Sequence, residues 1–179
     1  MSLTFATLLP GLVLIFLGVP LLLGSSRAAS ALKSFPRSTA ATYVFFGLGA
    51  ACFLYRIWNL SAADFGDYRN LLFIGFAVIA ALSFYCVPDF LAVRGLCVLV
   101  LVGAMPLLDA GYMLYDQKQI YFYKVLVYLS IVLAIWLGAQ PWRLRDFFDW
   151  LFRVPGRSRA LGGASLAYGL LLAVVAFTY

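Results

Sequence analysis

Side chains able to carry out chemistry are scarce in this chain. It has 179 residues, no His among them, and its seven acidic residues are all Asp. Without His, the common haem ligand, the common metal ligand and the usual general base are missing. Cys52, Cys86 and Cys97 stand singly in apolar runs, so no C-x-x-C redox motif is present. The sequence therefore predicts no enzyme: no catalytic residues, no metal site and no cofactor.

One acid lies well inside an apolar run, and an ionisable residue within a membrane segment is a functional-site hypothesis. This is Asp109 in "AMPLLDAGYMLY", and Arg56 in "CFLYRIWNL" lies at a similar predicted depth. An isolated charge in hydrocarbon would be expensive, so the two are predicted to form an intramembrane polar pair. The pair would be an ion or substrate site, or alternatively a structural ion pair, and separate snorkelling of the two residues to the outer interface is a third reading.

Tyrosines gather around the segment that follows Asp109. Trp and Tyr are enriched where membrane meets water, so this group predicts an aromatic belt at the outer surface. A ligand-stacking site is the alternative. The aromatic residues concerned are Tyr112, Tyr115, Tyr121, Phe122, Tyr123 and Tyr128.

Basic and aromatic residues are mixed in "WRLRDFFDWLFRVPGRSR", which covers residues 142–159. At 100° per residue, apolar side chains share one face of a helix over 142–153 and charged side chains share the other. This pattern predicts an amphipathic helix lying in the membrane interface, with its arginines on anionic headgroups. Arg145 and Asp149, and Asp149 and Arg153, are spaced to pair along that helix. The predicted lipid-contacting residues are Arg143, Arg145, Phe147, Phe148, Arg153 and Arg157.

The elements around these residues are hydrophobic. The chain is 65% hydrophobic and 11% charged, against about half and about a quarter in a soluble domain. Crossing a bilayer takes about 20 apolar residues, and only helices satisfy the backbone there. The third and fifth segments are short, so five spans plus a re-entrant segment is an alternative to six. The segments are 3–23, 39–60, 71–88, 95–115, 124–141 and 160–179.

The basic residues set the expected orientation, because the side richer in Lys and Arg stays cytoplasmic. Nine lie in the first, third and fifth connections, and four lie on the other side. Both termini are therefore predicted outside the cytoplasm, in what we expect to be a bacterial inner membrane. The nine are Arg27, Lys33, Arg37, Arg94, Arg143, Arg145, Arg153, Arg157 and Arg159, and the four are Arg56, Arg69, Lys118 and Lys124.

The predicted fold is an all-α integral membrane protein in one domain over 1–179. Its six transmembrane helices would form three hairpins, with the interfacial helix before the last span. A weak internal repeat relates 12–53 to 132–173: "VLIFLG" aligns with "LAIWLG", and Lys33 aligns with Arg153. Repeated hairpins occur in transporters, but they also build inert scaffolds.

These features favour an accessory or structural subunit of a larger membrane complex, with lipids and other membrane subunits as partners and no nucleic acid. Small residues in "GLGAA" and "GGASLAYG" predict close helix packing, for example through Gly47 and Ala51, either within the chain or toward a partner chain. The alternative is a transporter or membrane-embedded binding component for a small molecule or ion. A cavity lined by Asp109, Arg56 and Tyr112 would favour transport.

We predict that a cysteine at position 157, in a chain without its native cysteines, is labelled by a membrane-impermeant thiol reagent only after cells are opened. The nine-to-four distribution of basic residues is the reason. Position 118 is the matched control and should be labelled in intact cells. Labelling of position 157 from outside would reverse the whole topology.

Overall fold

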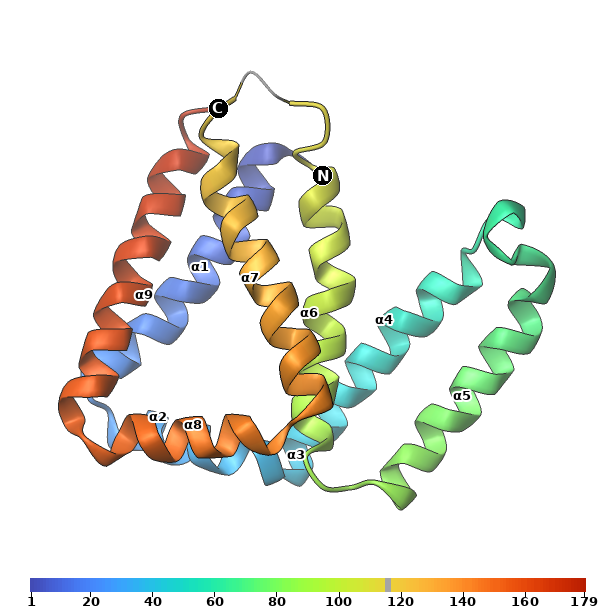
Figure 1. Ribbon diagram of the computed structural model, residues 1–179, viewed down its shortest axis with the longest axis horizontal. Coiled ribbons are helices and arrows are strands. Elements are labelled where there is room, and N and C mark those ends of the chain that lie inside the picture. Colours follow the sequence, from blue (N-terminus) through green and yellow to red (C-terminus); the bar gives the residue numbers. More distant parts are fainter. Residues whose placement is uncertain (115–116) are drawn as a thin grey trace. The chain divides into compact units, whose positions relative to one another are not determined.

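The computed structural model describes residues 1–114 and 117–179, and within these ranges the chain forms helices and no strands (Figure 1). Short 3-10 helices lie in two connections. The first contains η1 (Phe35–Arg37), and the second contains η3 (Ala62–Asp64) and η4 (Gly66–Tyr68). A π-helical segment, η2 (Thr42–Phe46), leads into α4. The α-helices are α1 (Leu3–Leu22), α2 (Ser26–Ser34), α3 (Thr39–Ala41), α4 (Gly47–Trp58), α5 (Arg69–Cys86), α6 (Leu91–Asp109), α7 (Ile120–Ala139), α8 (Trp142–Arg153) and α9 (Pro155–Ala176).

Six helical segments are long and apolar enough to cross a membrane, which confirms the six predicted spans as helices of that kind. The third and fifth, which looked short in sequence, extend over 21 and 20 residues. The fourth differs most from its predicted bounds, because α6 begins at Leu91 and ends at Asp109. The second span joins α3, η2 and α4 into one segment, Thr39–Trp58.

Local signals explain where the terminal spans begin and end. Ser2 caps α1 by accepting a hydrogen bond from the Phe5 amide, at 3.4 Å. Gly24 follows α1 with a φ of 63°, a left-handed conformation that glycine adopts without steric cost. Val154 is extended and Pro155 is the first residue of α9, where the missing N–H of proline costs nothing.

The chain divides into two compact units. Unit 1 comprises Met1–Lys33, Gly103–Leu133 and Arg145–Tyr179, and unit 2 comprises Ser34–Val102 and Ala134–Leu144. Each unit is described by itself below. The predicted single domain, the internal repeat of 12–53 with 132–173 and the three-hairpin arrangement all stay predictions.

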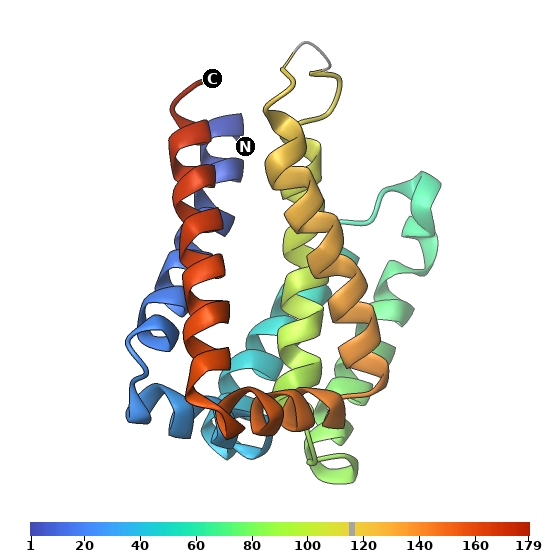
Figure 2. The same ribbon diagram turned by 60° about the vertical axis from the view of Figure 1, so that its left-hand side comes forward.

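Unit 1 is built on the antiparallel pair of α1 and α9, drawn in blue and red in Figure 2. Glycines allow the two backbones to touch. A Cβ added at Gly11 would lie 3.0 Å from the carbonyl oxygen of Gly169, and one at Gly18 would lie 2.9 Å from that of Gly162. Each helix thus places two glycines seven residues apart, about two turns, on the face toward the other. The first and last spans are held together by backbone proximity.

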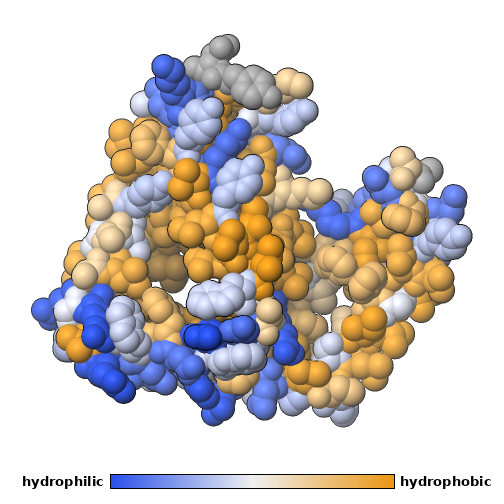
Figure 3. Space-filling view, in the orientation of Figure 1, coloured by the Kyte–Doolittle hydropathy of each residue, from blue (hydrophilic) through white to orange (hydrophobic). Residues whose placement is uncertain are grey.

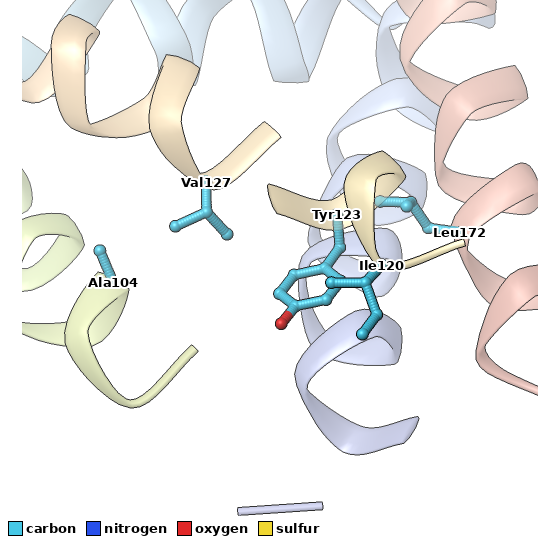
Figure 4. Packing of buried hydrophobic residues seen from close by; sticks show 5 residues of the cluster. All are labelled: Ala104, Ile120, Tyr123, Val127 and Leu172. Atoms are coloured by element: carbon cyan, nitrogen blue, oxygen red, sulfur yellow. The ribbon is translucent and has the colours of Figure 1, made fainter. Parts of the chain in front are cut away.

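The hydrophobic cluster of unit 1 lies beside that helix pair. Five buried residues from α6, α7 and α9 form it, and Figure 4 shows them as Ala104, Ile120, Tyr123, Val127 and Leu172. The largest is Tyr123, which is 0% exposed. Burial of this ring differs from the surface position that the aromatic-belt prediction gave it.

Unit 2 joins α4 to α5 through aromatic rings. Edge-to-face pairs are favourable beyond the area they bury. Phe53 meets Phe76 with ring centroids 5.1 Å apart, and Trp58 meets Phe73 at 5.4 Å. At the other end, Phe84 meets Phe46 edge-to-face at 5.1 Å. These contacts form a ladder along the antiparallel pair.

Within the chain, the close backbone contact of α4 is made by Gly49, and a packing role for Gly47 toward a partner chain stays a prediction. Nothing lies within 4 Å of a Cβ added at Gly47, whereas one at Gly49 would lie 3.0 Å from the carbonyl oxygen of Gly95 in α6. A Cβ at Gly95 would in turn overlap the backbone of Phe46. The close approach is therefore between α4 and α6, with Gly49 and Gly95 at its centre.

We predict opposite effects for alanine at two adjacent glycines of α9. A Cβ at Gly162 would overlap the Leu22 backbone, so Gly162→Ala should lower the free energy of unfolding by about 1–3 kcal/mol. A Cβ at Gly163 meets only the Leu22 Cδ1, at 3.7 Å, so Gly163→Ala should be neutral or stabilise by up to about 1 kcal/mol through helix propensity. Unfolding in mixed micelles of increasing denaturing detergent measures both, and equal effects would contradict the packing of α1 on α9.

Candidate functional site

The basic connector forms helix α8, which contacts α2 within unit 1. The ammonium of Lys33 lies 4.0 Å from the Asp149 carboxylate and 5.9 Å from the centroid of the Phe152 ring. Both partners of the ion pair are exposed, so it is worth about 1 kcal/mol at most. Helices α2 and α8, whose sequences the repeat hypothesis aligns, thus contact each other within unit 1.

The ion pairs within α8 differ from the predicted ones. Arg145 binds the adjacent carboxylate of Asp146 at 2.8 Å, and Asp149 is engaged by Lys33. Asp149 pairs with neither Arg145 nor Arg153 in the part of the chain described, although helical spacing predicts both pairs. The reason is geometric: a neighbouring residue and a residue from α2 both reach a carboxylate more closely than residues four positions away on the helix.

The start of α9 is fastened to α8 by an arginine. The Arg157 guanidinium lies 4.5 Å from the centroid of the Trp150 ring and donates a hydrogen bond to the Trp150 carbonyl oxygen at 3.2 Å. A cation over an indole face is attracted by the ring quadrupole. This contact fixes the bend around Pro155, and it uses part of the guanidinium that was expected to bind lipid.

The other predicted lipid residues lie along the same connector. Leu151 is buried against unit 1, whereas Phe147 and Trp150 are exposed and stack with centroids 6.1 Å apart. In unit 2, the Arg143 guanidinium lies 5.7 Å from the centroid of the Trp136 ring. Figure 3 shows hydrophilic residues gathered over α2 and α8. Placement of α8 in a membrane interface, with Arg153 and Phe148 on lipid, stays a prediction.

The proposed polar pair is divided between the two units. Arg56 belongs to α4 of unit 2 and is exposed, two residues before that helix ends. Asp109 is the last residue of α6, in unit 1, and is also exposed. Asp109 thus stands at the end of the fourth candidate span. Their pairing stays a prediction.

A mainly apolar pocket that also contains Gln117 and Lys124 lies beside the first turns of α7 in unit 1, with a cavity volume of about 270 Å³. Lys124 reaches from it to the carbonyl oxygen of Gly111, at 2.9 Å. Close by, a Cβ at Gly111 would overlap the Tyr123 hydroxyl, which is buried and has no hydrogen-bond partner among the residues described. The pocket is lined by Leu114, Gln117, Ile120, Tyr121, Lys124, Val125 and Tyr128.

The tyrosines predicted as one group therefore separate. Tyr112, Tyr121 and Tyr128 are exposed, as an interfacial belt requires, and Tyr123 is in the core. Tyr115 lies outside the described residues. A cavity lined by Asp109, Arg56 and Tyr112 would favour transport, and none of these three residues lines this pocket.

An apolar groove in unit 2 has no counterpart in the sequence prediction. Its volume is about 260 Å³, and it runs between α4, α5 and α6. The residues come from three helices that are distant in sequence, so no local pattern could have identified it. Its lining is Phe46, Ala50, Phe53, Leu54, Phe76, Ile79, Ala80, Ser83 and Val98.

Together these features define the class: in the part of the chain that the structure describes, the regular elements are all helical, and six of the helical segments have the length and composition to span a membrane. No group of three or more metal-ligating side chains occurs among residues 1–114 and 117–179. No family model matches the sequence, and neither a curated protein nor a solved structure is detectably similar to it.

We predict that Asp109 and Arg56 are energetically coupled. Removing one charge would strand the other in a medium that solvates it poorly, so Asp109→Ala should cost more stability than the double replacement. A double-mutant cycle on detergent unfolding should give a coupling energy of about 0.5–3 kcal/mol. A value of zero would mean that each residue reaches the outer surface separately, as the position of Asp109 at a helix end also allows.

Proposed function

We propose that this protein is an accessory or structural subunit of a larger membrane complex, and that α5 is the helix on which a partner docks. The observation that carries this is the burial of α5. None of its most apolar stretch is buried within the chain, against 33% for α6. Figure 3 shows mainly hydrophobic residues over it.

The outward side of α5 has the composition of a helix contact. Leu71, Ile74, Val78, Leu82 and Tyr85 follow helical spacing and are all at least half exposed. Exposure alone means little, since lipid tails are as apolar as leucine.

Small residues on the same side are what distinguish a helix contact from a lipid-facing surface. Gly75 lies within the outward arc, and nothing is within 4 Å of a Cβ built there. Ala81 is exposed on that side as well. Small residues let a second backbone approach closely, which lipid does not require.

A second candidate function is binding of a small solute at the pocket beside α7. It is favoured by Lys124, half-buried and hydrogen-bonded only to a carbonyl in the part of the chain described. An anion would complete its coordination. We place this second, because one lysine and one glutamine give little specificity and the pocket lacks the acidic residue that proton-coupled transport commonly uses.

The setting proposed for either function is a bacterial inner membrane, with both termini outside the cytoplasm and α8 against anionic lipid. It is supported by the distribution of basic residues and by the exposed Phe147 and Trp150 beside them. Anionic lipids would then be the partner of the connector, and another membrane subunit the partner of α5.

We predict that a photo-crosslinking amino acid at Val78 captures a second polypeptide of defined mass in native membranes. Val174 on α9 is the matched control. It is also an exposed valine in a candidate span, with an exposed fraction of 67% against 51% for Val78, and it should capture only lipid. Gly75→Leu should abolish the Val78 adduct without lowering stability, because its side chain would point into open space and leucine favours helix. Lipid adducts alone at both positions would refute α5 as a docking helix.

A further inference from the structure

The groove of unit 2 and an arginine beside it form a site that suits one phospholipid. We propose that an anionic phospholipid binds here, with one acyl chain in the groove and its phosphate on the Arg94 guanidinium. This site is separate from the α8 connector, and it is independent of the accessory-subunit proposal.

The groove matches an acyl chain in chemistry and in length. Among its lining residues, only Ser83 carries a side-chain polar group, and that hydroxyl already donates to the Ile79 carbonyl at 2.7 Å. The lining contributed by the end of η2 and by α4 runs from Phe46 to Leu54, about 12 Å at 1.5 Å per residue. One leaflet of the hydrocarbon core is about 15 Å deep, so the groove follows a chain through most of it.

Arg94 supplies the charge. It is half-buried in the first turn of α6, and its guanidinium has no hydrogen bond, ion pair or ring partner among the residues described. By contrast, the nearby Arg37 guanidinium lies over the Phe90 ring, at 5.4 Å. A guanidinium presents a fork of donors that fits a phosphate, and leaving it partly desolvated without an anion is unfavourable.

Helical spacing connects the two parts. Val98 lines the groove, and Arg94 lies one turn before it on the same side of α6. Between them Gly95 lies against the Phe46 backbone, at the end of the groove. With the connections on the cytoplasmic side, Arg94 is at headgroup level and the groove extends from it into the membrane.

The wall at that end has an irregular backbone. The π-helical segment η2 ends at Phe46, and such segments are frequent at functional sites. Its Tyr43 stacks on Phe84 at 5.4 Å, so the aromatic ladder fixes the position of the wall. The groove is thus shaped by contacts that do not depend on a ligand.

The test is binding of phosphatidylglycerol to the full chain in mild detergent, followed by native mass spectrometry and thermal unfolding. Wild type should retain one lipid and melt at a higher temperature with it. Arg94→Gln should weaken binding about tenfold or more, the usual loss for a charge-assisted hydrogen bond. Arg94→Lys keeps the charge but not the fork of donors, so it should recover only part of the binding. Lys118→Gln removes one exposed charge elsewhere and should change nothing.

A second pair of variants tests the chain-binding part. Ala50→Leu fills the groove and should abolish retention, whereas Ala51→Leu adds the same side chain at an exposed neighbouring position and should not. This pair decides the question if Arg94→Gln fails to fold.

Two further ligands separate the sources of affinity. Inorganic phosphate and diacylglycerol should each bind far more weakly than phosphatidylglycerol. Equal binding by either, or phosphatidylglycerol binding that survives both Arg94→Gln and Ala50→Leu, would overturn the proposal.

Discussion

When two helices associate within a bilayer, their apolar side chains exchange contact with lipid tails for contact with another helix, and this exchange gives no hydrophobic gain. Their association therefore depends on how closely they pack. In unit 1 that constraint is met where α1 and α9 bring backbone against backbone. Gly11 faces Gly169 and Gly18 faces Gly162, and a side chain at any of the four would meet backbone atoms at about 3 Å or less. The rest of the unit follows from this contact, because it joins the first and last spans of the chain and leaves α7 to pack beside them.

Unit 2 meets the same constraint with large side chains. Its α4–α5 pair is held by a ladder of aromatic rings, which separates the two backbones, and the glycine contact is shifted to α4 and α6. Backbones held apart on one side and together on the other leave space between the three helices. The groove is the consequence of combining these two modes of packing, and its apolar lining follows from the composition of any membrane helix.

Much of the architecture could be predicted from the sequence. Hydrophobicity is additive along the chain, so the six spans and the helix over the basic connector were predicted close to their observed positions. Which residues pack against one another was harder to predict from the sequence. The pattern of small residues includes both Gly47 and Gly49, and only Gly49 makes a close contact within the chain, because spacing on one helix does not reveal which side meets a neighbour. Similarly, Tyr123 looks like its exposed neighbours in sequence, and only the fold places it in the core.

The charged residues illustrate why a site is harder to predict than a span. Asp109 interrupts an apolar run in the sequence, but in the structure it is the last residue of α6 and is exposed. In the sequence, Arg94 is one of several basic residues in the connections between the predicted spans. Its distinction is that it is half-buried and has no partner among the described residues, whereas the other arginines without a partner, Arg27, Arg56, Arg153 and Arg159, are exposed. A half-buried arginine without a partner among the described residues is a position at which an external anion would gain much, and burial of this kind exists only in three dimensions.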